Sequence, residues 1–336
     1  MNVLLVIDSL GSGGAQRQLV NLALGLKEKK YNVKVFIYNT SDNFFLNNLS
    51  KNGIKIYYAD KYKKFPIFLK QIFIIFYLRK VIKNNIDSII SFQHLPSIYS
   101  AFAKIGLGRK KIIIGQRTSS KAPTNIIKRS LFYFSAYLSD AIVTNSKKEK
   151  EFLEKVSIFS KKVRCIWNGY KIDSSVKKIS LKKKQLKKLL ILGRVAAPKN
   201  GLNLLKGILI FLERNGWCPE ITWVGRKDTD KLSIKMQNQM DSFLNNNPEI
   251  LSKFKYIKEQ RELYKFYHNT DALILPSLYE GLPNILIDAI NNGIPCLASD
   301  CSGSDDILKG NKSGLIFGIN NKFELLKLMN KLHENY

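Results

Sequence analysis

A single carboxylate, Glu280, stands between a short apolar run and a predicted helix. The run, residues 271–276, predicts a buried strand, and Pro283 and Gly293 suit the start and the end of a helix. A second strand is predicted at residues 294–299. Glu280 is therefore expected at the carboxyl edge of a parallel sheet, where such sheets bind ligands. The N–H groups of the helix start suit a phosphate, so the nearby carboxylate is expected to bind sugar hydroxyls.

A basic loop follows another predicted strand, residues 189–192, and precedes a predicted helix at residues 202–215. It carries Arg194 and Lys199 among glycines. Two cations at a strand end can neutralise a diphosphate, whose charge must be stabilised as it departs. The alternative is an ordinary basic loop on a basic protein. The carboxylate downstream, Glu280, favours the diphosphate interpretation.

Together these segments resemble the retaining GT-B glycosyltransferases of family 4. That family carries two glutamates separated by seven residues. Here Glu280 takes the first position and Asp288, one methylene shorter, takes the second. The basic loop is similar to the family's Gly-Arg…Lys-Gly pattern, except that Asn200 separates Lys199 from Gly201. The resemblance implies that Glu280 contacts the donor sugar and that Asp288 holds the nucleotide ribose.

The resemblance also implies a mechanism without a protein nucleophile. Arg194, Lys199 and the backbone amides of Leu282 and Asn284 would stabilise the departing diphosphate, since Pro283 has no N–H. The expected catalytic residues are Glu280, Arg194, Lys199 and His94. The expected donor-binding residues are Gly13, Gly14, Arg194, Lys199, Glu280, Gly281, Leu282, Pro283, Asn284 and Asp288.

Residues 11–14 form a glycine loop after the first predicted strand. It resembles the family loop that approaches the donor phosphate and the acceptor. A dinucleotide fingerprint is the competing interpretation, but it needs a glycine where this chain has Gln16 and an acid closing the second strand. His94 follows the predicted strand at residues 88–92. It is expected either on the acceptor or phosphate side of the site or in a structural role.

Arg117 follows the predicted strand at residues 111–115. It resembles a charged family loop, although Gln116 stands where many relatives have glutamate. Asn145-Ser146 and Asn168-Gly169 also resemble family loops, with less specificity, and the latter pair is equally compatible with a turn.

Metal chemistry has one candidate, the triplet Asp228-Thr-Asp230. Such a triplet holds a divalent cation in glycosyltransferases of the GT-A class. Here it comes late in the chain in a lysine-rich loop, so a surface loop is favoured. No other cluster has metal-ligand spacing, and we expect no metal or other cofactor. The four cysteines contain no Cys-x-x-Cys pair, which suits a reducing cytosol.

The chain alternates strands with helix-length segments in both halves, which predicts an α/β fold with parallel sheets. The resemblance makes this GT-B: two Rossmann-like doubly wound domains facing across a cleft. We expect an acceptor-binding domain at residues 1–170, a basic linker at 171–187 and a nucleotide-sugar-binding domain at 188–336. A length of 336 residues fits two domains.

The net charge of +29 predicts an anionic partner, although part of it reflects a chain rich in lysine throughout. Residues 61–83 combine aromatic residues with cations. They are expected either to lie at an anionic membrane interface or to form a buried helix with basic ends. The aromatic residues offered to the interface are Phe65, Phe68, Phe73, Phe76 and Tyr77, and the cations are Lys61, Lys63, Lys64, Lys70, Arg79, Lys80 and Lys83. No spanning helix and no signal peptide are expected.

The function predicted from the sequence is transfer of a hexose or N-acetylhexosamine from a nucleotide-diphosphate donor, which we expect to be UDP-linked. The predicted acceptor is a lipid-linked, lipopolysaccharide or capsule glycan. The enzyme would be cytoplasmic and peripheral to the inner face of the cell membrane. An inverting transferase or a sugar-nucleotide epimerase is the main alternative. Charge alone suggests a nucleic-acid-binding protein, and no nucleic acid is expected as a partner.

Overall fold

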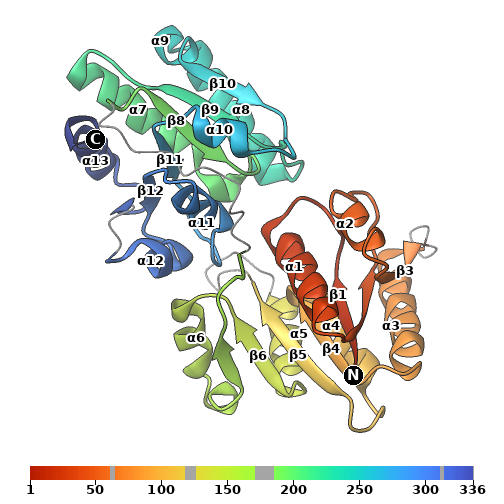
Figure 1. The fold of residues 1–336 in the computed structure, drawn as a ribbon. Coiled ribbons are helices and arrows are strands. Elements are labelled where there is room, and N and C mark those ends of the chain that lie inside the picture. The colour runs from red at the N-terminus through yellow and green to blue at the C-terminus, as the bar shows by residue number, and fades with distance from the viewer. Residues whose placement is uncertain (61–64, 118–125, 171–184, 311–313, 336) are drawn as a thin grey trace. The chain divides into compact units, whose positions relative to one another are not determined.

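The computed structural model describes residues 1–60, 65–117, 126–170, 185–310 and 314–335. The chain divides into two compact units, Met1–Tyr170 and Lys171–Tyr336 (Figure 1). Most of the predicted linker, residues 171–184, lies outside the described ranges.

The first unit contains a seven-stranded sheet in which every strand runs parallel to its neighbours. The order is β3-β2-β1-β4-β5-β6-β7. The strands are β1 (Asn2–Ile7), β2 (Asn32–Ile37), β3 (Lys55–Tyr58), β4 (Ser88–Phe92), β5 (Lys111–Gln116), β6 (Ala141–Thr144) and β7 (Val163–Cys165).

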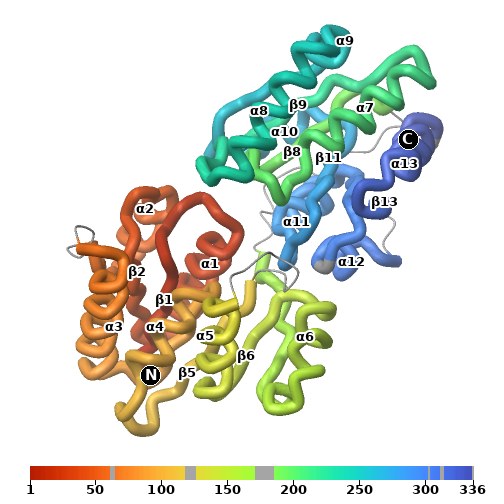
Figure 2. The backbone as a smooth tube through the Cα atoms, turned by 180° about the vertical axis from the view of Figure 1, so that it is seen from behind, coloured from red at the N-terminus to blue at the C-terminus, as the bar shows by residue number. Residues whose placement is uncertain are grey.

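Helices cover both faces of this sheet because its strands are apolar on both sides. Leu4 and Val6 of β1 pack with α3 and α4, whereas Val3, Leu5 and Ile7 pack with α1 and α2. The view from behind shows α3, α4 and α5 together on one face (Figure 2). The helices are α1 (Gly14–Glu28), α2 (Leu46–Ser50), α3 (Ile67–Lys83), α4 (His94–Lys104), α5 (Ile126–Tyr137) and α6 (Lys147–Glu154), with a 3₁₀ turn at Ser157–Phe159.

The second unit repeats this architecture with six parallel strands, in the order β10-β9-β8-β11-β12-β13. These are β8 (Lys188–Leu192), β9 (Glu220–Val224), β10 (Phe254–Ile257), β11 (Ala272–Leu275), β12 (Cys296–Ser299) and β13 (Gly314–Phe317). The helices are α7 (Gly201–Asn215), α8 (Lys231–Asn245), α9 (Pro248–Leu251), α10 (Tyr264–His268), α11 (Asn284–Asn291), α12 (Ser302–Leu308) and α13 (Lys322–Asn335), with a 3₁₀ turn at Ala197–Lys199.

Strand β8 shows the same two-sided burial. Leu189 and Ile191 pack with α7, α8 and α13, whereas Leu190 and Leu192 pack with α10, α11 and α12. The predicted fold, two Rossmann-like parallel-sheet domains, is confirmed at the level of each unit.

Each sheet has one topological switch point. In the first unit it lies between β1 and β4, because α1 leaves β1 on one face and α4 leaves β4 on the other. In the second unit it lies between β8 and β11, since α7 and α11 depart to opposite faces. Loops that separate in this way leave a crevice at the carboxyl edge of the sheet. The loops that the sequence singled out follow the strands of these switch points: the glycine loop and His94 follow β1 and β4, and the basic loop and Glu280 follow β8 and β11.

The differences from the sequence prediction are at the sheet edges. Strands β3, β10 and β13 were not predicted, and all three are short and lie next to only one other strand. Strand β7, at the opposite edge of the first sheet, is also short and ends at Cys165. Edge strands bury less side-chain surface, so their apolar pattern is weaker than that of central strands.

Helix α3, in the segment 61–83, is buried in one half and exposes apolar side chains in the other. Its second half is buried against the sheet through Ile74, Leu78, Val81 and Ile82. Its first half exposes apolar side chains, namely Phe65 just before the helix, Ile67, Phe68, Leu69 and, further on, Phe76. No helix in the described part of the chain is long and apolar enough to cross a membrane.

Two residues assigned to the interface in residues 61–83 are engaged elsewhere. The Tyr77 ring packs against the buried ring of Phe36, with centroids 5.6 Å apart. The Arg79 guanidinium donates to the backbone carbonyls of Ala103 and Ile105. Tyr77 thus packs against the sheet and Arg79 against the C-terminal end of α4, so neither side chain faces a membrane as assigned. Lys61, Lys63 and Lys64 lie outside the described residues.

Candidate active site

The switch point of the second unit brings together the two segments that the sequence singled out. Lys199, in the loop after β8, donates to Glu280, in the loop after β11, with Nζ and Oε1 2.6 Å apart. Ser277 donates to the same Oε1 at 2.8 Å. The side chains of Lys199 and Glu280 are only 16% and 19% exposed. Oε2 of Glu280 accepts no hydrogen bond from the described residues, so it is the oxygen available to a ligand hydroxyl.

Backbone contacts hold the two loops in register. The amide of Leu278 donates to the carbonyl of Pro198 at 2.8 Å. Gly193 has φ 121°, a conformation that favours glycine. Its carbonyl accepts the indole N–H of Trp223 at 3.0 Å. The basic loop is thus fixed by the core of its own unit before any ligand arrives.

Arg194, the other predicted cation, forms an ion pair with Asp228. Its side chain is 49% exposed, three times the value for Lys199. Asp230 caps the N-terminus of α8 by accepting from the amides of Leu232 and Ser233, both at 3.1 Å. The acidic triplet is therefore a surface loop with structural contacts, and the Arg194–Asp228 pair could not be read from sequence spacing alone.

Helix α11, which follows the loop with Glu280, starts one residue later than predicted. Pro283 is the N-cap of α11 and Asn284 is its first residue, while Gly293, at φ 76°, follows its end as predicted. Gly303, which the sequence did not single out, lies against this loop. A Cβ atom there would come within 2.0 Å of the carbonyl oxygen of Gly281. Only glycine allows α12 to pack so closely.

Three further residues, which the sequence did not predict, lie near the Glu280 carboxylate. Ser277 contacts it directly. Burial raises the pKa of the Tyr279 hydroxyl above its usual value, and Arg194, Asp230 and Glu280 act on it electrostatically. Burial and the charge of Glu280 raise the pKa of the Cys301 thiol.

Asp288, the second predicted acid, lies one turn into α11 and is 4% exposed. Its predicted ribose contact remains a prediction.

The switch point of the first unit places His94 at the start of α4. Its Nε2 lies 2.8 Å from Oε1 of Gln116, at the end of β5, and its ring stacks on Phe132 with centroids 4.3 Å apart. Burial lowers the pKa of His94. Gln116 thus presents a neutral amide to a histidine that burial favours in its neutral form.

The glycine loop lies across the same switch point. Gly13 is the N-cap of α1 and Gly14 its first residue. The side-chain amide of Gln16 donates to Oδ1 of Asp8 at 3.0 Å, and Asp8 directly follows β1. Gln18 donates to the carbonyl of Gly169 at 3.1 Å, so the segment after β7 reaches α1. The predicted donor contacts of Gly13 and Gly14 remain predictions.

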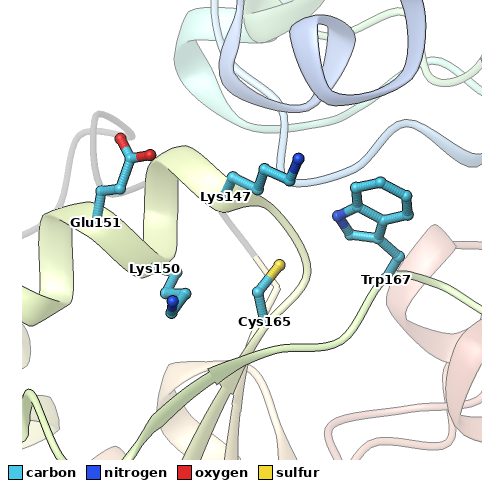
Figure 3. A pocket seen from close by; sticks show the side chains of 5 residues that line it. All are labelled: Lys147, Lys150, Glu151, Cys165 and Trp167. Carbon is cyan, nitrogen blue, oxygen red and sulfur yellow. The ribbon is translucent and has the colours of Figure 1, made fainter.

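A pocket of about 500 Å³ lies at the carboxyl ends of β6 and β7. Lys147 and Trp167 point toward one another above Cys165, with the ammonium 5.4 Å from the ring centroid (Figure 3). Lys150 and Glu151, on α6, complete the lining. Trp167 is 51% exposed. The pocket therefore combines an accessible aromatic surface with charged groups.

Among the residues that the structure describes, no group of three or more histidine, cysteine, aspartate or glutamate side chains could hold a metal ion.

Two family models divide the chain between them. Residues 12–174 match the model of "Glycosyltransferase Family 4", and residues 173–336 match "Glycosyl transferases group 1". The chain belongs to the family 4 glycosyltransferases, and each of its units has the Rossmann-like fold of the GT-B class. It is an enzyme of the glycosyltransferase type.

Characterised relatives extend over most of the chain. One is the Campylobacter jejuni enzyme named as the α-1,4-N-acetyl-D-galactosaminyltransferase acting on GalNAc-α-(1→4)-GalNAc-α-(1→3)-diNAcBac-PP-undecaprenol, which is 27% identical over 97% of this chain and 87% of its own length. Another is the capsular polysaccharide biosynthesis glycosyltransferase CapH of Staphylococcus aureus, 25% identical over 91% of this chain and 83% of its own.

Among solved structures, Anabaena HepE in complex with UDP and glucose is similar with a TM-score of 0.80. It is 16% identical, and the match covers 100% of this chain and 90% of HepE. At this identity the similarity supports the fold alone.

Proposed function

We propose that this enzyme transfers a sugar, with retention of configuration, from a UDP-linked donor to a hydroxyl of a glycan carried on a lipid diphosphate. The observation that carries the proposal is the Lys199–Glu280 pair at the switch point of the second unit. The pair joins a cation and a carboxylate at one sheet edge, which supports our assignment of the cation to the diphosphate and of the carboxylate to the sugar. The Campylobacter relative, named for an undecaprenyl-diphosphate-linked acceptor, supports the acceptor class.

In this reaction the bond between the anomeric carbon and the UDP oxygen breaks. The acceptor oxygen bonds to the same face of that carbon, and its proton passes to the departing phosphate oxygen. Lys199 and Arg194 stabilise the charge that develops on UDP. Glu280 holds the donor sugar through Oε2, since Oε1 is already engaged by Lys199 and Ser277. We propose that His94, in the first unit, contributes on the acceptor or phosphate side of the reaction. We also propose that the reaction requires no metal.

Product analysis tests this proposal against its alternatives. The enzyme is incubated with a panel of UDP-sugars and polyprenyl-diphosphate-linked glycans in excess EDTA, and the new linkage is determined by NMR. An α-linked product from an α-linked donor supports retention. A β-linked product indicates an inverting transferase, and an isomerised UDP-sugar without transfer indicates an epimerase. Activity only with added Mn²⁺ or Mg²⁺ would contradict the metal-free mechanism.

We further propose that the first unit lies on an anionic membrane through α3 and α5. The first half of α3 exposes Ile67 and Phe68, and the first half of α5 exposes Ile126 and Ile127. Both helices lie on the same face of the sheet (Figure 2). Exposed cations accompany them: Lys80 and Lys83 on α3, and Lys128 and Arg129 on α5. Apolar side chains flanked by cations are typical of surfaces that bind anionic lipid.

Vesicle sedimentation tests the membrane proposal. Anionic vesicles should sediment the enzyme, neutral vesicles should not, and high salt should release it. The double variant Ile67→Glu/Phe68→Glu should lose binding to the vesicles. The matched control is Leu232→Glu, which changes a strongly exposed apolar residue of α8 in the second unit. Equal sedimentation of both variants would contradict the assignment to α3.

A further inference from the structure

The first unit holds a cation that the mechanism above does not use. The Arg117 side chain follows β5 at the carboxyl edge of the sheet, on the β5–β6–β7 side of the switch point. Its guanidinium lies over the ring of Phe92, 4.7 Å from the centroid. Nη1 donates to Oδ1 of Asn168 at 3.1 Å. These neighbours position the guanidinium, but neither carries a negative charge.

No carboxylate of the described residues pairs with Arg117. Its Nε is buried and has no hydrogen-bond partner. Burial, with no compensating anion, lowers the pKa of Arg117 to about 10. The group is still charged at neutral pH. A buried charge without a partner is costly, and such charges in proteins are normally paired.

The neighbouring strand end carries a second unsatisfied group. Gln116 is in register with Thr144 across β5 and β6, so the next residues, Arg117 and Asn145, follow the two strands at the same level. Asn145 is 3% exposed, and its Oδ1 has no hydrogen-bond partner. Buried polar atoms are rarely left unpaired, and those that are often mark a place where a ligand or water belongs.

The backbone around Arg117 is built for close approach. Gly115 lies beneath its side chain, and a Cβ atom there would stand 2.9 Å from the carbonyl of Ser91 and 3.4 Å from Nε of Arg117. Any larger residue would displace either β4 or the guanidinium. Together with Phe92 and Asn168, this glycine sets the guanidinium in one place.

We propose that Arg117 binds a phosphate group of the acceptor. A guanidinium fork matches a phosphate with two parallel hydrogen bonds. Nη1 and Nη2 are the terminal nitrogens that can make them, with Nη1 exchanging Asn168 for the ligand. The proposal rests on the proposed function, because it takes the acceptor to be linked through a diphosphate. It gives the first unit an anion site that is separate in the chain from Arg194 and Lys199.

Calorimetry with inorganic diphosphate tests the site in the full-length enzyme. Saturating UDP occupies the donor site first, so that the diphosphate reports on the remaining site. Wild type should bind diphosphate under these conditions, and Arg117→Gln should bind it roughly tenfold or more weakly, as expected for loss of charge-assisted hydrogen bonds. Arg109→Gln, which changes an exposed arginine of the same unit, is the matched control and should bind as wild type does.

Two further variants separate ligand binding from a structural role. Arg117→Lys keeps the charge but loses the fork, so its affinity should lie between those of wild type and Arg117→Gln. Asn145→Asp adds a negative charge at the neighbouring strand end. It should weaken diphosphate binding, because like charges repel.

The outcomes that overturn the proposal are distinct. Absence of diphosphate binding by UDP-saturated wild type, or equal binding by Arg117→Gln, refutes the site. Weaker UDP binding by Arg117→Gln, to the same extent as for diphosphate, assigns Arg117 to the donor instead. A lower thermal midpoint in Arg117→Gln with unchanged diphosphate affinity makes Arg117 purely structural. Failure of wild type to bind UDP at all contradicts the proposed function without bearing on Arg117.

Discussion

The carboxyl edges of the two sheets share a topology but differ in how their charges are compensated. In the second unit each predicted cation has an acid: Lys199 pairs with Glu280 and Arg194 pairs with Asp228. In the first unit His94 pairs with the neutral amide of Gln116, and Arg117 has no acid among the described residues. The same fold thus supports one site that is electrostatically balanced when empty and one that is not.

This difference has a physical consequence for ligands. In the second unit carboxylates already hold both cations, so a diphosphate bound there, as we propose, would have to compete with them. In the first unit an anion would compensate a charge that the protein leaves uncompensated. We therefore expect ligand binding to depend most on the position of the loops in the second unit, and most on the charge of the side chain in the first.

The largest expected effect comes from moving the second unit's loop without changing any charge. In Gly303→Ala the new Cβ atom would overlap the carbonyl of Gly281, so the loop with Glu280 must shift. A misplacement of about 1 Å can cost on the order of a hundredfold in rate. Steady-state transfer assays check this. Gly25→Ala in α1 is the control, because a Cβ atom there meets nothing within 4 Å. Equal activity of the two variants would show that the loop is not held by this contact.

Removing the carboxylate charge should have the next largest effect. Glu280→Gln keeps the shape but loses a charge-assisted hydrogen bond, worth roughly 1.5–3 kcal/mol, or about ten- to a hundredfold in turnover. UDP should still bind, as calorimetry would show. Glu262→Gln, at an exposed acid of the same unit, is the matched control. Near-wild-type turnover of the Glu280 variant would remove this residue from the site.

A smaller effect is expected from removing either cation. Arg194→Ala and Lys199→Ala should each weaken UDP binding by about tenfold, the value of one charged hydrogen bond, and leave uridine binding nearly unchanged. Calorimetry with both ligands gives the ratio. Because Lys199 is more buried than Arg194, its loss should weaken UDP binding more. Equal weakening of UDP and uridine would indicate a damaged fold instead.

The smallest effect concerns pH and the first unit. Burial lowers the pKa of His94 below the value of about 6.5 expected in the unfolded chain. Between these two values the unfolded state binds a proton that folded His94 does not. The free energy of unfolding should therefore rise with pH through this window and reach its full value above about 6.5.

His94→Gln should flatten that part of the pH profile, measured by urea unfolding between about pH 5 and 7.5. His268→Gln, at an exposed histidine of α10, is the control and should keep the slope. If the slope persists in His94→Gln, another group is responsible for it.

Central elements were accessible from sequence because their signals are local. The predicted strand at residues 88–92 matches β4 to the residue, and the one at residues 189–192 misses only the first residue of β8. Edge strands β3, β10 and β13 were missed because half-exposed strands have weak patterns. The start of α11 was misplaced by one residue, since proline is acceptable both as N-cap and as the first helical residue.

The sequence by itself determined the central elements, the parallel-sheet architecture of both units and the residue types at two strand ends, because periodicity and turn residues act over a few neighbours in the chain. Only the tertiary structure decided which charges meet. Lys199 and Glu280 are 81 residues apart and come together because β8 pairs with β11. The uncompensated guanidinium of Arg117 is likewise a property of packing, since no spacing in the chain records which acids a folded side chain fails to reach.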